Sequence, residues 1–172
     1  MKKSPILAAA LLLTACAGSP DNHYYTLSAV APAQVAAGGR PAIHLASLRL
    51  PELYGRPQMV IRTGPQSVDI DEYDRWAEPL DRMATRILAQ DLAARRTNDA
   101  EPLPATVLVD EFAADRSGIA RLSGSWKITE ADGTTRSRAF SLSQPVPGND
   151  PAAAAAALSV LLGKLADEIA GN

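Results

Sequence analysis

The sequence is short of the residues that build disulfides, metal sites and most active sites. Its 172 residues contain one cysteine and two histidines, and aromatic residues make up 5% of the chain. One cysteine cannot close an internal disulfide, and His23 and His44 have neither a cysteine neighbour nor an H-x-x-x-H spacing for zinc. A formal net charge of −2 lacks the basic excess of nucleic-acid binders. The sequence therefore predicts no metal, no cofactor and no nucleic-acid partner, and both histidines are expected to be ordinary strand residues.

The one cysteine stands where a short apolar segment ends. Lys2 and Lys3 precede an apolar run at 6–13, and the tetrapeptide LTAC ends at Cys16. This run is far shorter than the roughly 20 residues of a transmembrane helix, and the whole pattern is typical of a secretory signal peptide. LTAC also resembles the bacterial lipobox, which implies cleavage before Cys16 and acylation of that residue. Position 17 is alanine and not aspartate, which in Gram-negative lipoproteins of this kind implies sorting to the outer membrane. The alternative is a plain signal peptide with an unmodified cysteine.

These signals divide the chain into a lipoprotein signal peptide at 1–15, a lipidated tether at 16–22 and one folded domain at 23–172. Loss of the two leader lysines makes the mature net charge −4. The segment between Cys16 and His23 spans at most about 20 Å at ~3.3–3.6 Å per residue. The domain should therefore lie almost against the membrane.

The first part of the domain predicts strands. Four are expected, at 23–29, 43–50, 58–62 and 66–70, with a loop at 31–41 and a turn at 63–65. The acidic segment DIDEYD at 69–74 fails the calcium-loop pattern, because its sixth and twelfth positions lack glycine and glutamate. A solvated turn before a helix is expected there, since acids are favoured near the positive end of a helix.

The second part predicts a helix, a meander and another helix. Apolar residues at helical spacing from Leu80 to Leu92 predict a helix of about 17–20 residues, with Pro79 in its first turn and the Arg95–Arg96 pair in its last. Three strand candidates at 105–115, 119–131 and 134–144, of which the middle one alternates cleanly, predict an antiparallel meander. Asp150 and Pro151 suit the N-cap and first position of a final helix. The order favours an α+β fold: a single domain with a mostly antiparallel sheet and two main helices packed on it.

Catalytic motifs are missing from the sequence. It contains no G-x-S-x-G, no P-loop and no G-x-G-x-x-G. Ser117 lies in a tight turn, and no histidine is placed by sequence to activate it. The sequence therefore favours a protein that is not an enzyme.

The segment LPELYGRPQMVIRTGPQSVDIDEYDRWAEPL at 50–80 carries a family resemblance. With the lipobox, the YYTL strand at 24–27, the RWAEPL segment at 75–80 and the lone tryptophan strand at Trp126, it resembles the ABC-type transport auxiliary lipoprotein family. The resemblance covers essentially the whole mature chain.

This resemblance implies a partner rather than a reaction. Family members accompany MCE-domain systems that move phospholipids between the two membranes of Gram-negative bacteria. The lipoprotein docks from the outer-membrane side on a periplasmic MCE-domain protein (PqiB-like), and a homo-oligomeric ring would match a tubular partner. Few aromatic residues and many alanines argue against a roomy lipid cavity, so lipid is expected to pass by the subunit or through an assembly.

Aromatic and arginine side chains of the motif are the candidate partner-binding residues, because such residues are favoured anchors at interfaces. They are Tyr54, Arg56, Arg62, Arg75 and Trp76. The alternative is that Trp76 fixes the start of the helix, while Arg62 and Arg75 pair with acids such as Asp74 or Glu78.

Two other classes of function stay open. One is a stand-alone envelope lipoprotein that binds a small ligand or acts as an assembly chaperone. The other, with the least support, is a lipid hydrolase.

Overall fold

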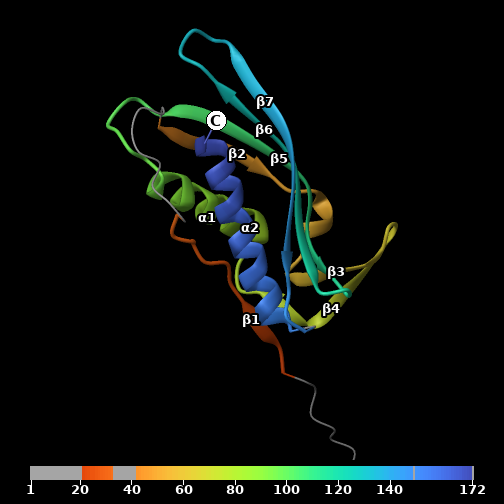
Figure 1. Ribbon diagram of the computed structural model, residues 1–172. Coiled ribbons are helices and arrows are strands. Elements are labelled where there is room, and N and C mark those ends of the chain that lie inside the picture. Colours follow the sequence, from red (N-terminus) through yellow and green to blue (C-terminus); the bar gives the residue numbers. More distant parts are fainter. Residues whose placement is uncertain (1–20, 33–41, 149, 172) are drawn as a thin grey trace, which may run out of the picture.

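The computed structural model describes residues 21–32, 42–148 and 150–171. Cys16, the signal peptide and most of the tether lie outside the described residues, as does most of the loop at 31–41. The elements, in chain order, are β1 His23–Tyr25, β2 Ile43–Arg49, the 3-10 helix η1 Glu52–Tyr54, β3 Gln58–Gly64, β4 Ser67–Trp76, α1 Leu80–Ala94, β5 Leu103–Asp115, β6 Ile119–Thr129, β7 Thr135–Pro145 and α2 Pro151–Gly171 (Figure 1).

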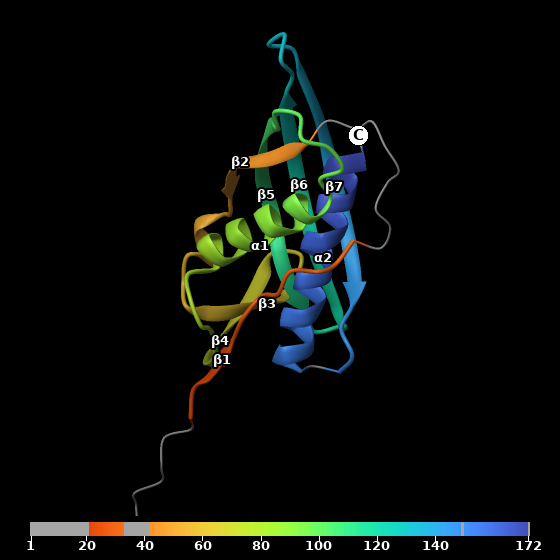
Figure 2. The same cartoon turned by 90° about the vertical axis from the view of Figure 1, so that its left-hand side faces the viewer.

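All the strands join one mixed sheet, and both helices cover the same face of it (Figures 1 and 2). The sheet order is β1-β4-β3-β5-β6-β7, with β2 beside the first half of β5. The ladders β1–β4, β2–β5 and β3–β5 are parallel, whereas the two longest, β5–β6 and β6–β7, are antiparallel. The predicted α+β class, with a mostly antiparallel sheet and two packed helices, is confirmed.

The predicted meander is β5, β6 and β7. In β6 the side chains of Leu122, Trp126 and Ile128 are buried against the helices, as the alternating pattern predicts. The turns that join the three strands contain Gly118 and Gly133, whose φ angles are +79° and +85°. Only glycine adopts such angles without cost.

The two predicted helices are present. In α1 the six apolar positions are buried, but the helix has 15 residues, and Pro79 precedes it instead of lying in its first turn. Arg95, expected in the last turn, is the C-cap residue. The α2 helix begins as predicted, because Asp150 Oδ1 accepts a hydrogen bond from the Ala152 N–H at 3.0 Å. Neither of these two described helices is long and apolar enough to cross a membrane.

Two strand predictions need correction. The first strand ends at Tyr25, because the chain then leaves the sheet and crosses the helices. The strand expected at 66–70 instead continues to Trp76 and includes the acidic segment that was predicted as a turn. Asp71 Oδ1 accepts the N–H groups of Tyr73 and Asp74 at 3.0 Å each. The pairing with β3 is irregular over this stretch, so the acids form a bulge within β4.

Gly124 allows β5 and β6 to approach each other where β5 is irregular. Its φ is +157°, and a Cβ atom there would lie 2.1 Å from the Leu108 carbonyl oxygen and 2.9 Å from Val109 Cα. Both are backbone atoms, so a side chain at this position requires the β5 backbone to move.

We therefore expect Gly124→Ala to lower the free energy of unfolding by more than about 4 kcal/mol, in the range reserved for severe core disruption. Gly133→Ala is the matched control, because a Cβ there meets nothing within 4 Å. It should cost only about 1–2 kcal/mol of left-handed strain. Urea unfolding of both variants measures the difference, and equal losses would contradict the steric argument.

Candidate functional site

The five candidate partner-binding residues fall into two groups. Tyr54 and Trp76 are buried, with exposed fractions of 4% and 5%. The three arginines, Arg56, Arg62 and Arg75, are partly exposed. The arginine side chains therefore reach the surface, whereas the two aromatic rings lie inside the fold.

The aromatic residues hold the motif segment against the sheet. Tyr54, in η1, accepts a hydrogen bond at its hydroxyl from the Phe112 N–H of β5 at 3.2 Å. Burial raises the pKa of Tyr54. The backbone N–H of Trp76 donates to the Pro57 carbonyl at 2.7 Å. This bond joins the end of β4 to the start of β3. The first bond ties the start of the motif segment to β5, and the second ties the end of the segment back to its start.

The arginines bond mostly to nearby backbone. Arg56 Nε donates to the Leu53 carbonyl and Arg75 Nε to the Glu72 carbonyl, each at 3.0 Å. Arg62 Nε lies 3.1 Å from Glu111 Oε1 of β5. The pairing of Arg62 or Arg75 with Asp74 or Glu78, considered from the sequence, is not found: Asp74 bonds to Tyr25 and His23, and Glu78 pairs with Arg86.

An apolar pocket of about 230 Å³ lies between β3, β4, β5 and the start of α2. Tyr54 and Trp76 form part of its wall, with apolar side chains from all four elements. The acidic side chains that line it are Asp71, Asp74, Asp115 and Asp150, and Arg116 is the one cation among the lining residues. The pocket therefore suits an apolar group attached to a positive charge.

A polar groove of about 370 Å³ adjoins this pocket and shares Asp115 and Arg116 with it. Three ion pairs lie in or beside the groove, Arg62–Glu111, Arg116–Asp69 and Arg121–Asp115. Burial alone would raise the pKa of Asp115, but hydrogen bonds from Ser117, Arg121 and the Ile119 N–H lower it to about 2. Arg62 is predicted from the motif, whereas Arg116 and Arg121 are not, because Arg116 lies in a short turn and Arg121 on the polar side of β6, where nothing in the sequence indicates a site.

Ser117, both histidines and Tyr25 form hydrogen bonds within the fold. Ser117 Oγ donates to Asp115 Oδ1 at 2.5 Å, and no histidine bonds to it. His23 Nδ1 lies 3.1 Å from Asp74 Oδ1, which also accepts the Tyr25 hydroxyl at 2.9 Å. Burial and this bond to Asp74 raise the pKa of Tyr25 to about 12. Across 21–32, 42–148 and 150–171, no group of three or more His, Cys, Asp or Glu residues could hold a metal ion.

Residues 26–30, here called the N-terminal strap, cross from β1 over both helices. Within the described part of the chain the strap pairs with no strand, so its N–H groups need other acceptors. Leu27 donates to Met83 Sδ at 3.1 Å, Ser28 to Ser159 Oγ at 3.1 Å and Val30 to Asp91 Oδ1 at 2.8 Å. Side chains of α1 and α2 therefore fix the segment that follows β1.

Asp91, which accepts the Val30 N–H, has incomplete hydrogen bonding. It is fully buried, and its second oxygen, Oδ2, has no hydrogen-bond partner within the described part of the chain. Burial raises the pKa of Asp91, although the Val30 N–H and the Arg95 guanidinium act to lower it. The folded state therefore binds a proton at Asp91 more tightly than the unfolded state does.

The raised pKa of Asp91 determines how the free energy of unfolding changes with pH. The contribution of Asp91 to stability is fully present below its unfolded pKa, near 4, and is lost as the pH rises through the raised folded value. Asn at this position does not titrate and still accepts the Val30 N–H. We expect the free energy of unfolding of Asp91→Asn, relative to the native protein, to rise between about pH 3.5 and about pH 7. A difference that stays constant in urea unfolding across this range would contradict the shift.

Trp76→Ala tests whether the buried motif residues support the fold. Loss of this side chain should lower the free energy of unfolding by about 3–5 kcal/mol, as for other buried aromatic residues. Tyr73→Ala on the same strand is the control: Tyr73 is 41% exposed, and its replacement should cost less than about 1 kcal/mol. Similar losses for both variants would contradict the assignment of Trp76 to the core.

Comparison with known proteins identifies the family. Two solved structures share the fold. One, an uncharacterized protein, has a TM-score of 0.70 at 16% sequence identity, with 88% of this chain and 98% of that chain covered. The other is protein XCC0632 from Xanthomonas campestris, of the DUF330 family, with a TM-score of 0.66 at 20% identity and 87% and 92% covered. No curated protein matches at a significant level.

The family model of the ABC-type transport auxiliary lipoprotein component matches residues 25–170, nearly the whole of the domain described above. This match confirms the resemblance drawn from the motif at 50–80. The role named by the family is that of an auxiliary component of a transport system, which is a non-catalytic kind of role. The chain belongs to the ABC-type transport auxiliary lipoprotein component family.

Proposed function

We propose that this protein is a non-enzymatic lipoprotein of the outer membrane that faces the periplasm and docks on a periplasmic MCE-domain protein. In this role it is an auxiliary component of an ABC-type system that moves phospholipids between the two membranes. The observation that carries the proposal is the family match over residues 25–170, because an auxiliary transport component needs a partner. The lipobox that ends at Cys16 supplies the anchor.

The apolar pocket and the adjoining polar groove are the proposed docking surface. Binding energy at protein interfaces is concentrated where an apolar or aromatic anchor fills a pocket, surrounded by residues that exclude water. A pocket of 230 Å³ beside three ion pairs has this arrangement. Arg62 lines the groove, Tyr54 and Trp76 form part of the pocket wall, and the partly exposed Arg56 follows Tyr54 by two residues.

Charge indicates what the partner would present. The residues lining the pocket include four aspartates and one arginine. We therefore expect a partner segment with an apolar side chain next to a lysine or arginine. Such a segment would place its apolar group against Tyr54 and Trp76 and its cation near the carboxylates.

Storage of a phospholipid inside the subunit is not supported. Pockets for drug-sized ligands have volumes of about 300–1,000 Å³, whereas this pocket has about 230 Å³. A lipid with two acyl chains is larger than most of those ligands. We therefore propose that lipid passes outside the subunit or through an assembly, for which a homo-oligomeric ring is the arrangement that suits a tubular partner.

The experiment that tests this proposal is crosslinking in cells, followed by capture of the tagged protein and mass spectrometry. The native protein should capture an MCE-domain protein. A Cys16→Ala version with a cleavable signal peptide should capture less of it, because the anchor sets the local concentration. Failure of both forms to capture such a protein would overturn the docking role.

Arg62→Ala tests the docking surface itself. Capture of the partner should fall about tenfold, equivalent to a loss of ~1.4 kcal/mol. The free energy of unfolding should change by less than about 1 kcal/mol, because the Arg62–Glu111 pair is partly exposed. Arg86→Ala removes a comparable exposed pair on α1, away from the groove, and should leave capture unchanged. Equal capture by both variants would exclude Arg62 from the interface.

The pocket is the one observation that supports the alternative function named in the sequence analysis, a stand-alone lipoprotein that binds a small ligand. A stand-alone lipoprotein that binds a small amphipathic cation would use the same apolar wall and the same carboxylates. Failure of partner capture, together with a rise in melting temperature when a short alkylamine is added, would favour this function.

A further inference from the structure

The exposed apolar side chains are not evenly distributed over the described surface. Within the described residues, four large hydrophobic side chains are exposed: Tyr24 at 63%, Leu108 at 48%, Tyr73 at 41% and Ile70 at 39%. Tyr24 and Tyr73 lie on the adjacent strands β1 and β4. Tyr24 is the most exposed of the four, although it lies between two residues whose side chains bond to the protein.

The strand register brings Tyr24, Tyr73 and Arg75 close together. Tyr24 is paired with Arg75 in the parallel ladder, and residues paired in a ladder share a face of the sheet. Tyr73 lies two residues before Arg75, in the bulge of β4, and its side chain is also exposed. Tyr24, Tyr73 and Arg75 therefore cluster at this end of the sheet, and the surface that they form is here called the tyrosine face.

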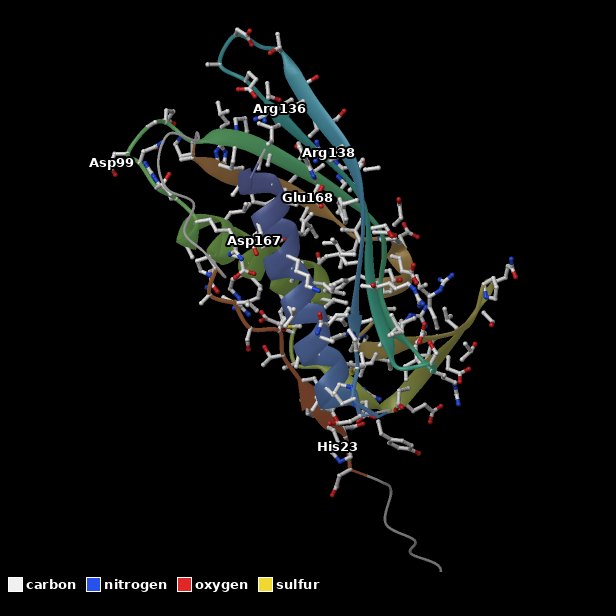
Figure 3. All side chains as sticks on the ribbon, viewed as in Figure 1. His23, Asp99, Arg136, Arg138, Asp167 and Glu168 are labelled. Carbon is white, nitrogen blue, oxygen red and sulfur yellow. The ribbon has the colours of Figure 1, made fainter. Side chains whose placement is uncertain are left out.

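This surface lies at the end of the molecule where the chain enters the fold. Figure 3 shows His23 of β1 at one end, while Arg136 and Arg138 lie toward the other end, on the β6–β7 hairpin. The six residues between Cys16 and His23 reach at most about 20 Å. The tyrosine face is therefore the part of the described domain that an anchor at Cys16 keeps close to the bilayer.

We propose that the tyrosine face is a membrane seat, which rests on the phospholipid headgroup layer and fixes the orientation of the domain. The proposal depends on the lipid anchor of the proposed function. Tyrosine is enriched at membrane–water interfaces because its ring is apolar and its hydroxyl is polar. Arg75 adds a guanidinium beside the rings, which suits a phosphate oxygen.

Charges around the tyrosine face decide which lipid it suits. Asp21 and Glu72 are exposed near it, whereas Asp71 and Asp74 are partly buried and hydrogen-bonded. One guanidinium against two exposed carboxylates gives no net attraction to an anionic membrane. The seat is therefore suited to zwitterionic headgroups, and its contact with the bilayer does not depend on anionic lipid.

A fluorescence experiment on the full-length lipidated protein tests the seat. The protein is reconstituted in phosphatidylcholine vesicles with and without bromine on the acyl chains, which quenches tryptophan on contact. Trp76 and Trp126 are buried, at 5% and 2% exposure, and give a constant background. Tyr24→Trp and Tyr73→Trp each add a reporter on the tyrosine face. Ala131→Trp, in the exposed turn of the β6–β7 hairpin, is the matched control.

Both reporters on the tyrosine face should be quenched at least about twofold more than Ala131→Trp, as expected for rings at the interface. Adding phosphatidylglycerol should leave the quenching unchanged. Quenching of both reporters no greater than that of Ala131→Trp, in protein that floats with the vesicles, overturns the seat and leaves the anchor intact. Protein that does not float with the vesicles overturns the anchor, and the seat with it.

Discussion

Arg95 is the residue on which the arrangement of the helices depends. Its buried guanidinium donates to Asp167 Oδ1 at 2.6 Å and to the carbonyl oxygens of Asp91 at 2.7 Å and Gly163 at 2.9 Å. A guanidinium is always charged, so it is stable in the interior only where oxygen acceptors surround it. These bonds hold the end of α1 against the second half of α2. Asp91 also binds Val30, and the same cluster therefore joins both helices to the strap that follows β1.

The first half of α2 has the opposite character. Its alanine-rich turns carry little side-chain volume, and Ala154 lines the pocket between this helix and the sheet. The motif at 50–80 supplies the other side of that pocket through Tyr54 and Trp76. Space is left between the helix and the sheet because the small alanine side chains face Tyr54 and Trp76. Hydrogen bonds of the Tyr54 hydroxyl and of the Trp76 backbone hold these two residues in place. The docking surface proposed above is a consequence of this difference in side-chain volume.

The two ends of the molecule differ in a way that suits an anchored subunit. At one end, β1 and the bulge in β4 present tyrosines and an arginine beside the point where the chain enters the fold. At the other end, the β6–β7 hairpin extends beyond the helices (Figure 1). A short tether and a seat on the headgroup layer would together restrict rotation of the domain. A partner would then meet the pocket and groove in a constant orientation, which lowers the entropy cost of docking.

The sequence by itself determined the elements with strong periodicity. The buried face of α1, the N-cap of α2 and the alternation in β6 follow from side-chain spacing, because each helix or strand repeats its own geometry along the chain. The family resemblance likewise depends on local motif residues. Only the tertiary structure decided that the strap leaves the sheet, that acids 71–74 form a bulge instead of a turn, and that Arg62 pairs with Glu111. It also decided that Tyr54 and Trp76 are buried while Arg56, Arg62 and Arg75 reach the surface. Several of these features depend on partners far apart in sequence, such as Arg62 with Glu111, Tyr54 with Phe112 and Ser28 with Ser159. Local pattern carries no information about such distant pairs.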